Sequence, residues 1–418
     1  MFFFYQIIIL IIIILSPIIL IIRFLKNKEH TKRFVEKFCV ISKKKSKGNL
    51  IWIHAASVGE FMSVVPLINE LEKMRDIQTL LLTTSTLSSS KIFQNYKFKK
   101  TIHQFFPIDF FYFSSKFIKH WKPKVAIFID SEIWPSMYKQ INNHNVPLLL
   151  MNARITNKSF KRWNFFNKFT KNIFRNIEIA YPSNIETKQY LQKLKVKKIK
   201  KIGNLKFSDL KKQETKKFTS YFIKSIKNRL IFCASSTHPG EEKIIAQLHL
   251  VLKKRFKNLL TIIIPRHVQR INEINDEIKL LGLKTIIKTT NQSLKKETDI
   301  FLVDTYGETR NFFNISKIAF IGGSLVKHGG QNPIEPARYQ LSIIHGPNID
   351  NFRDIYKLFN KKKIAYKITN FNQLRNITQK LLKTKKNKKI NLEKIGNLIL
   401  KKSVLEIADV LKNEIKKT

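Results

Sequence analysis

The feature that most constrains the fold is a regular alternation of short apolar runs with longer stretches of helical spacing, such as residues 61–74 and 110–120. A short apolar run followed by an amphipathic stretch is typical of a parallel strand and its crossover helix. Repetition of this unit predicts an α/β fold with parallel sheets. The strands expected from the apolar runs are residues 50–54, 79–83, 125–129, 147–151 and 177–181, then 230–234, 259–264, 300–303, 318–321 and 342–344.

The alternation pauses once, over the polar, lysine-rich residues 206–228, and then restarts. Two halves of similar size predict two Rossmann-like domains that face each other across a cleft. A chain of 418 residues is long enough for both. We expect a transmembrane anchor at residues 1–22, a basic juxtamembrane segment at 23–48, an N-terminal domain at 49–210, a linker at 211–228, a C-terminal domain at 229–390 and a closing amphipathic helix at 391–418.

The chain begins with an uncharged apolar run at residues 2–22. As a helix this run would be about 31 Å long, which is the thickness of the hydrocarbon core of a bilayer. Basic residues follow it and none precedes it, so the positive-inside rule places the rest of the protein in the cytoplasm. A cleaved signal peptide has the reverse order, with basic residues before a shorter apolar run and small residues at its end. We therefore expect a permanent single-pass anchor, with the basic segment attracted to anionic lipids by about 1 kcal/mol for each charge near the surface.

The chain is strongly basic, because 78 Lys and Arg against 29 Asp and Glu give a formal net charge of +49. Such a charge raises nucleic acid or an anionic membrane as a partner. The excess is mostly lysine, however, and it is spread along a chain that is also rich in Ile, Asn and Phe, whereas a functional patch would be clustered. We attribute it mainly to a drift in composition and expect no nucleic-acid partner. The two cysteines, Cys39 and Cys233, exclude a disulfide framework and a multi-cysteine metal site.

Three polar clusters follow predicted strands in the first half, where open α/β sheets bind ligands. Glu60 falls at the start of a predicted helix, where it is either a carboxylate favoured by the helix dipole or a general base. In residues 130–135 two carboxylates bracket a serine, and a helix cap explains one of them but not both. Lys206 closes the third cluster, and a lone lysine in so basic a chain is more often solvated than functional.

Two further clusters lie in the second half. Residues 235–242, with residues 265–267 after the next strand, are typical of either a capped helix start or a phosphate-binding site in which Arg266 pairs with the anion. Residues 322–336 hold two glycine pairs, which permit close approach of the backbone to a ligand. Glu335 in this string can accept hydrogen bonds from vicinal hydroxyls such as those of a ribose. The simpler alternative is a glycine-rich loop and a helix without a ligand.

Together, the glycine string, the carboxylate and the two-domain plan predict a glycosyltransferase of the GT-B architecture with a nucleotide in its C-terminal half. No pair of aspartates suited to a metal ion stands at a predicted strand end. We therefore expect no metal and no cofactor. Charge from Arg266, Lys206 and helix N-termini, rather than Mg²⁺, should stabilise the departing phosphate.

Eight strings in the sequence occur in the order found in one family: H-A-A-S-V-G-E, D-S-E-I-W-P, N-A-R-I-T-N-K-S, G-N-L-K-F, S-S-T-H-P-G-E-E, P-R-H, D-T-Y-G-E and G-G-S-L-V-K-H-G-G-Q-N-P-I-E-P. Over nearly its whole length, the chain closely resembles the 3-deoxy-D-manno-octulosonic acid (Kdo) transferases of Gram-negative lipopolysaccharide synthesis. The resemblance implies an inverting, metal-independent transfer of Kdo from CMP-Kdo to a hydroxyl of the lipid A precursor (lipid IVA). It also implies an inner-membrane enzyme whose catalytic domains lie on the cytoplasmic face. The N-terminal domain would bind the acceptor and the C-terminal domain the CMP-sugar.

The resemblance assigns roles to particular residues. Glu60 matches the family's general base, which accepts the proton of the acceptor hydroxyl. Asp130 and Lys206 match residues that stabilise the transition state. The residues that match the CMP-binding segments are Pro265, Arg266, Tyr306, Gly307, Glu308, Asn332, Pro333, Ile334 and Glu335.

Three positions depart from the family's pattern. Asp130 stands where Glu is usual, which shortens the reach of the carboxylate by one methylene. Tyr306 replaces a usual Met and Gln331 a usual His, and we expect both to be tolerated because binding there relies on backbone groups. Two alternatives stay open, namely a GT-B glycosyltransferase that uses another nucleotide sugar and lipid acceptor, and a membrane-tethered nucleic-acid-binding protein. The second leaves the glycine strings unexplained.

Overall fold

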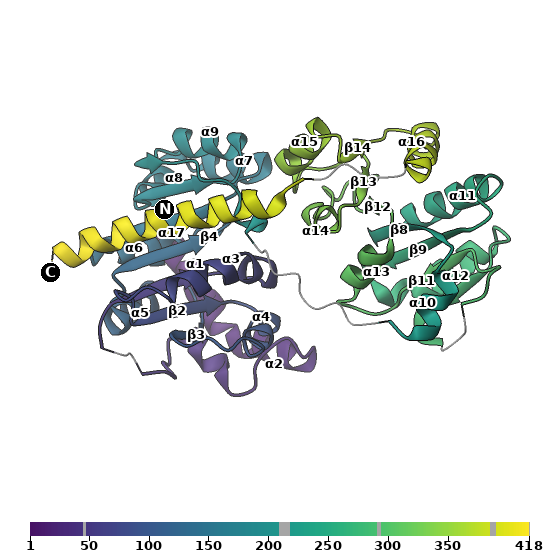
Figure 1. Cartoon of the computed structure of the whole chain (residues 1–418). Helices are drawn as coiled ribbons and strands as arrows, with labels where there is room; N and C mark the ends of the chain where they lie inside the picture. Colours follow the sequence, from purple (N-terminus) through teal and green to yellow (C-terminus); the bar gives the residue numbers. More distant parts are fainter. Residues whose placement is uncertain (45–46, 209–217, 291–293, 385–389, 418) are drawn as a thin grey trace. The chain divides into compact units, whose positions relative to one another are not determined.

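The computed structural model describes residues 1–44, 47–208, 218–290, 294–384 and 390–417. The chain forms two compact units, Met1–Leu210 with Glu393–Thr418 (unit 1) and Lys211–Leu392 (unit 2). Each unit is built on one seven-stranded parallel sheet with helices packed around it (Figure 1). The last helix, α17 (Leu392–Lys416), packs on unit 1, where Tyr181 Oη donates a hydrogen bond to Glu406 Oε2 at 2.9 Å. The end of the chain therefore returns to the N-terminal unit.

The sheet of unit 1 has the strand order β3-β2-β1-β4-β5-β6-β7. Its strands are β1 (Leu50–His54), β2 (Thr79–Thr84), β3 (Thr101–Phe105), β4 (Val125–Ile129), β5 (Leu148–Ala153), β6 (Ile179–Pro182) and β7 (Lys198–Ile199). Its helices are α3 (Val58–Leu71), α4 (Leu87–Phe93), α5 (Phe111–Trp121), α6 (Pro135–Asn143), α7 (Asn157–Phe165), α8 (Asn167–Phe174), α9 (Ile185–Lys193) and the 3₁₀ helices η1 (Arg33–Phe38) and η2 (Leu205–Phe207). The order of strands reverses between the neighbours β1 and β4, and open α/β sheets bind ligands at the carboxyl ends of strands beside such a reversal.

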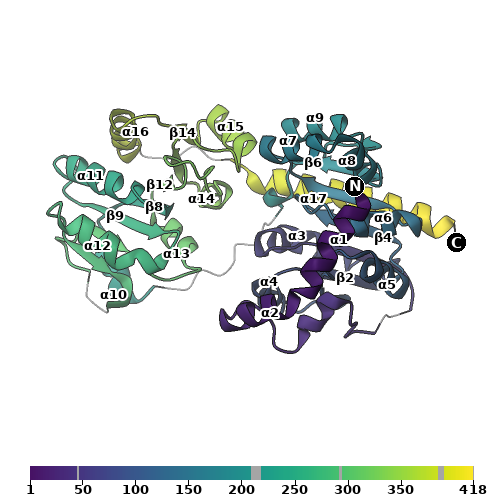
Figure 2. The ribbon, with the colours of Figure 1, turned by 180° about the vertical axis from the view of Figure 1, so that it is seen from behind.

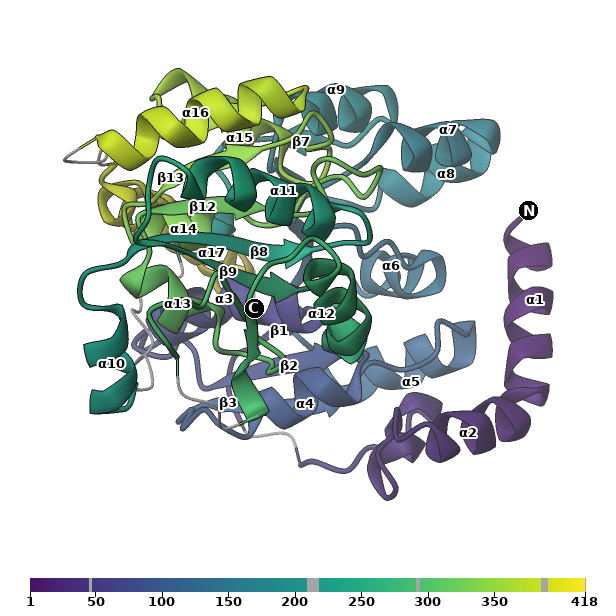
Figure 3. The same ribbon diagram turned by 90° about the vertical axis from the view of Figure 1, so that its right-hand side faces the viewer.

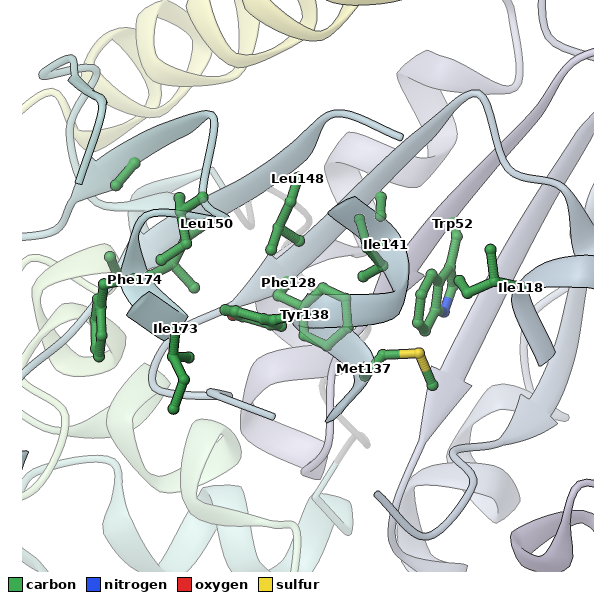
Figure 4. Close-up of a cluster of buried hydrophobic side chains, with 14 of the residues drawn as sticks. Trp52, Ile118, Phe128, Met137, Tyr138, Ile141, Leu148, Leu150, Ile173 and Phe174 are labelled. Carbon is green, nitrogen blue, oxygen red and sulfur yellow. The ribbon is translucent and has the colours of Figure 1, made fainter. Parts of the chain in front are cut away.

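The main core of unit 1 lies where helices α5, α6 and α8 cover the central strands (Figure 4). Every residue of β1 and β4 is buried, as expected for parallel strands that are covered on both faces. The ring of Phe128 on β4 lies 5.0 Å from that of Trp52 on β1 and 5.2 Å from that of Tyr138 on α6. Aromatic contacts of this kind stabilise a core beyond the burial of their area. They fix the two strands whose ends carry the site.

Unit 2 repeats the plan with the strand order β10-β11-β9-β8-β12-β13-β14. Its strands are β8 (Leu230–Thr237), β9 (Leu259–Pro265), β10 (Thr285–Ile287), β11 (Ile300–Leu302), β12 (Ile318–Ile321), β13 (Ser342–His345) and β14 (Ala365–Lys367). Its helices are α10 (Ser220–Ile226), α11 (Glu241–Lys253), α12 (Ile271–Lys279), α13 (Thr309–Ile315), α14 (Ile334–Arg338), α15 (Arg353–Lys361), α16 (Phe371–Lys383) and the 3₁₀ helices η3 (Val268–Arg270) and η4 (Lys288–Thr290). Here the order reverses between β8 and β12, which also pair in parallel.

Part of the linker predicted at residues 211–228 is helical. Residues 211–217 lie outside the described residues, but α10 begins after Thr219, whose Oγ1 accepts a hydrogen bond from Phe222 N at 3.2 Å. The ring of Phe222 packs 5.4 Å from that of Phe301 on β11. The polar residues that predicted a linker thus form, in part, a surface helix of unit 2. A surface helix needs apolar residues on one face only.

The N-terminal apolar run forms two helices, α1 (Phe2–Ile14) and α2 (Ser16–Leu25), bent by 54° (Figure 3). Pro17 accounts for the break because it has no backbone N–H and restricts the residue before it. Among the described residues no single helix is long and apolar enough to cross a membrane, whereas this bent pair passes by length and composition. The continuous span expected from the sequence is therefore interrupted near its middle.

Hydrogen bonds attach α1 to unit 1, across which it runs in Figure 2. Tyr5 Oη donates to Asp109 Oδ2 at 2.7 Å, and Gln6 Nε2 donates to Ser136 Oγ at 2.7 Å. Gln6 Oε1 also accepts from Phe111 N at 2.9 Å. Most other side chains of α1 are apolar and many of them are exposed. One edge of α1 is thus bound to the unit by polar groups, while an apolar surface remains uncovered.

Candidate active site

In unit 1 the structure brings together the three residues predicted to act in chemistry. Glu60 lies in the first turn of α3, Asp130 directly follows β4, and Lys206 lies on η2. All three follow strands at the carboxyl edge of the sheet. Lys206 Nζ is 3.8 Å from Asp130 Oδ2, and the charge of Asp130 acts on Glu60. The site therefore joins segments that follow the first, fourth and seventh strands of the unit.

Glu60 is both a helix cap and a carboxyl with altered acidity. Its Oε2 accepts hydrogen bonds from Ala56 N at 2.7 Å and Ser57 N at 3.4 Å, while Ser57 Oγ accepts from Glu60 N at 3.4 Å, which completes a capping box. Burial raises the pKa of Glu60 to about 7, helped by the negative charges of Glu132 and Asp130 and opposed by the two backbone donors. A carboxyl that titrates near neutral pH is suited to general base catalysis.

Asp130 is held in an unusual backbone conformation beside Lys206. Its φ of +62° lies in the left-handed region, which costs a non-glycine residue roughly 1–3 kcal/mol and is often found at functional sites. Its backbone is fixed by a bond from its N to Met151 O at 3.0 Å and one from Arg154 N to its O at 3.1 Å. Burial raises the pKa of the Asp130 carboxyl, and the positive charges of Lys206 and Arg154 oppose that rise. Lys206, only 22% exposed, is thus a partner of the site rather than a solvated lysine.

Two residues to which the sequence reasoning gave no separate role also reach this edge. Arg154 directly follows β5. Its position just after a predicted strand could have marked it as a candidate for the site. His54 is the last residue of β1 and is fully buried. Its Nε2 lies 3.4 Å from Glu132 Oε2, which also accepts a hydrogen bond from Trp134 Nε1 at 2.9 Å. A histidine at the end of an otherwise apolar strand could have been predicted from the sequence to reach the site.

In unit 2 the segments predicted to bind CMP also follow strands at the carboxyl edge. Pro265 is the last residue of β9, and Arg266 follows it with an exposed side chain. Tyr306, after β11, is 65% exposed, and its Oη donates a hydrogen bond to Gln269 Oε1 at 3.3 Å. This contact joins the segment after β11 to the segment after β9.

The third predicted segment surrounds the start of α14. Asn332 Oδ1 accepts a hydrogen bond from Ile334 N at 3.0 Å, and Pro333 precedes the first residue of the helix. Glu335 Oε1 accepts from Arg310 Nε at 2.6 Å. Because Arg310 lies on α13, which directly follows the segment after β11, this ion pair connects the second and third segments.

The segment after β11 turns at Gly307, between Tyr306 and Arg310, and the φ of Gly307 is +82°. The next residue, Glu308, lies with its Oε2 2.8 Å from Lys288 Nζ and also accepts a hydrogen bond from Thr305 Oγ1. The structure thus places all three predicted segments at one edge of the sheet and orients two of their carboxylates by contacts with basic side chains.

The first glycine pair of unit 2 serves contacts within the protein. A Cβ on Gly322 would lie 2.2 Å from Ser236 O, at the end of β8. The backbone N–H groups of residues 323–325 donate to the fully buried Glu241 carboxylate at 2.7 to 3.1 Å. A protein carboxylate thus occupies these donors, and the expectation that the glycine pair lets the backbone approach a ligand stays a prediction.

Two parallel α/β units, each with polar residues at the carboxyl edge beside a reversal of strand order, define the fold class of the GT-B glycosyltransferases. A family model described as 3-deoxy-D-manno-octulosonic-acid transferase (kdotransferase) matches residues 32–209. The chain is 35% identical over 369 residues to a 3-deoxy-D-manno-octulosonic acid transferase of Rickettsia bellii, covering 87% of each chain. The chain belongs to the 3-deoxy-D-manno-octulosonic acid transferase family.

A second relative agrees with this assignment, and a solved structure shares the fold. A 3-deoxy-D-manno-octulosonic acid transferase of Haemophilus influenzae is 31% identical over 351 residues, which cover 83% of this chain and 81% of that protein. The crystal structure of a glycosyltransferase from Rickettsia africae matches the fold with a TM-score of 0.58 at 16% identity, covering 88% of this chain and all of that chain. The protein is thus a glycosyltransferase that transfers Kdo in lipopolysaccharide synthesis.

Proposed function

We propose that the enzyme transfers Kdo from CMP-Kdo to a hydroxyl of the lipid A precursor (lipid IVA), with inversion at the anomeric carbon and without a metal ion. The observation that carries the proposal is Glu60, a partly buried carboxyl at the β1/β4 reversal with a pKa of about 7. Such a group accepts a proton readily near neutral pH. Family membership supports Kdo as the sugar, and the match of the unit 2 segments to the family's motifs supports CMP as its carrier.

Each bond change in this reaction has a residue assigned to it. The O–H bond of the acceptor breaks and its proton passes to the Glu60 carboxylate. The acceptor oxygen bonds to the anomeric carbon while the bond from that carbon to a phosphate oxygen breaks, and the electron pair leaves with CMP. Positive charge near the departing phosphate lowers the barrier. We assign this role to Lys206 in unit 1 and Arg266 in unit 2.

Incubation of the enzyme with CMP-Kdo and tetra-acylated lipid A precursor, followed by mass spectrometry of the lipid, tests the proposal. We expect the lipid to gain the mass of Kdo, with the same turnover in the presence of a metal chelator. CMP should compete with the donor and UDP should not. Inhibition by UDP together with no transfer from CMP-Kdo would instead identify a glycosyltransferase with another donor.

Arg266→Ala is expected to weaken CMP binding by about 10- to 150-fold. The substitution removes a charge-assisted hydrogen bond to the phosphate, which is worth about 1.5–3 kcal/mol. Calorimetric titration with CMP measures this change directly. Arg255→Ala, which removes another exposed arginine of unit 2, is the matched control and should leave the affinity unchanged. An unaltered affinity of Arg266→Ala would count against this position in the donor site.

We also propose that helices α1 and α2 attach unit 1 to the inner membrane, with both units on the cytoplasmic side, where CMP-sugars are made. The apolar surface of α1 supports this placement, because large exposed apolar surfaces are characteristic of membrane or protein contact. The cation Lys139 Nζ lies 4.4 Å from the centre of the Phe2 ring at the start of α1. A lysine at this end suits contact with anionic headgroups.

Protease digestion of intact spheroplasts is expected to leave both units uncut, because the protease reaches only the periplasmic side. Disruption of the membrane should then make the same sites accessible. A soluble cytoplasmic enzyme serves as the control for intact spheroplasts. Cleavage of either unit before disruption would contradict the proposed orientation.

A further inference from the structure

Glu132 is a partly buried carboxylate that has no task in the reaction as described above. It lies two residues after Asp130, in the segment between β4 and α6, and its side chain is 17% exposed. Its contacts are the hydrogen bond from Trp134 Nε1 at 2.9 Å and the approach of His54 Nε2 to 3.4 Å. The Trp134 indole therefore anchors this carboxylate, and the His54 ring lies beside it.

The ring of His54 is itself hydrogen-bonded to a buried residue of the core. Its Nδ1 lies 2.9 Å from Thr83 Oγ1, which also accepts a hydrogen bond from Trp52 Nε1 at 2.9 Å. His54, Thr83 and Trp52 are all fully buried. Because the hydroxyl engages Nδ1, the other ring nitrogen, the buried Nε2, is the one that approaches Glu132, without a hydrogen bond. A continuous series of contacts thus runs from the core to this carboxylate.

Glu60 and Glu132 are both placed at the end of β1. Glu60 Oε2 accepts a hydrogen bond from the N–H of Ala56, two residues after His54, and Glu132 Oε2 lies 3.4 Å from Nε2 of His54. The negative charge of Glu132 is one of the causes that raise the pKa of Glu60. The two carboxylates therefore interact although they come from different loops.

We propose that Glu132 is a positioning residue for the base: its carboxylate, hydrogen-bonded by Trp134 and close to His54, lies with Glu60 at the end of β1 and favours the transfer of the acceptor proton to Glu60. This inference rests on the proposed role of Glu60. When the acceptor O–H bond breaks and its proton reaches Glu60, the repulsion between the two carboxylates is relieved. The charge of Glu132 thus favours the step in which the new glycosidic bond forms.

Other charged groups lie near Glu60, and the experiment must separate their effect on Glu60 from that of Glu132. Helix α4, which also packs on α3, carries its only charged side chain, Lys91, in its last turn, away from its start at the carboxyl edge. The titratable groups on β1, in the segments after β4 and β5 and on η2 are His54, Asp130, Glu132, Arg154 and Lys206, and Asp109 in the segment after β3 is bound to the start of α6. Of these, Asp130 and Glu132 supply the negative charges that act on Glu60.

The test is the pH dependence of Kdo transfer by Glu132→Gln, which keeps the size of the side chain and removes its charge. The acid limb of kcat/KM reports the free-enzyme pKa of the base, and we expect it to move to lower pH by roughly one unit. Trp134→Phe keeps the charge but loses one hydrogen bond, so its limb should move in the same direction by less. Glu70→Gln on α3 is the matched control and should not move it. An acid limb that stays in place in Glu132→Gln would overturn the inference.

A second measurement needs no turnover and keeps the two proposals distinguishable. In full-length enzyme labelled with ¹³C at glutamate carboxyls, the Glu60 signal is identified by its absence in Glu60→Gln. Its titration midpoint should fall by the same amount in Glu132→Gln. If wild-type enzyme transferred no Kdo but this midpoint still moved, the proposed function would fail while the coupling held. An unmoved midpoint would refute the coupling whatever the activity.

Discussion

Glu60→Gln is expected to cut turnover by roughly 10²–10⁴-fold while leaving the affinity for CMP almost unchanged. Glutamine keeps the size of the side chain and an oxygen that can accept from Ala56 N, but it cannot take the proton of the acceptor hydroxyl. The segments assigned to CMP lie in unit 2, so donor binding should not depend on this residue. Steady-state kinetics with the lipid acceptor and calorimetry with CMP measure the two effects separately.

The wild-type enzyme should also lose activity as the pH falls through about 7. The pKa of Glu60 is raised to about 7, so the carboxyl is protonated below that pH and cannot act as a base. Glu70→Gln makes the same substitution on the same helix, at a residue paired with Lys73, and should be nearly neutral. If Glu60→Gln retained near-normal turnover with the lipid acceptor, the base would have to be sought at Glu132 or Asp130.

Lys206→Met should have the second largest effect, a loss of roughly 10²–10³ in kcat. Methionine retains an unbranched apolar side chain but removes the ammonium group that lies 3.8 Å from Asp130 Oδ2. The transition state would lose a positive charge. Asp130 would lose one of the charges that restrain its pKa, so that pKa should rise further.

Lys201→Met, at an exposed lysine shortly before η2, is the control for the loss of a positive charge and should leave kcat within about twofold of the wild type. Lys206→Arg keeps the charge and should retain more activity than Lys206→Met. Thermal denaturation of each variant separates a loss of fold from a loss of chemistry. A well-folded Lys206→Met enzyme with wild-type kcat would exclude Lys206 from the transition state.

The central strands could be predicted from the sequence because each is buried on both faces. β1, β4 and β12 have the bounds expected from their apolar runs. The strands that the apolar runs did not predict are β3, β7, β10 and β14, and these are the four edge strands of the two sheets. An edge strand needs less apolar sequence: β3 reads T-I-H-Q-F, and β7 has two residues. Their places are set by pairing with a neighbour, which local hydrophobicity does not report.

The candidate site, too, could be predicted only in part from the sequence. Glu60 and Asp130 could be predicted to lie at the same edge of the sheet, because the carboxyl ends of parallel strands lie together. Which of many lysines approaches Asp130 does not follow, because it depends on η2, whose Leu205 N donates to Asn152 Oδ1 at 3.1 Å. The role of Glu241 was hidden for the same reason: Glu241 follows β8, whereas the N–H groups that donate to its carboxylate follow β12. Contacts between loops distant in sequence require the folded chain.

The attachment of α1 to unit 1 affects how a form of this enzyme without its first two helices would behave. Deleting residues 1–25 would remove Tyr5 from the nearly inaccessible Asp109, whose carboxylate also accepts from Ser136 N and Met137 N in the first turn of α6. That turn directly follows the segment that carries Asp130 and Glu132. A shortened enzyme would therefore carry a less firmly held loop at the site, and its kinetics would understate those of the full-length protein even with a soluble acceptor.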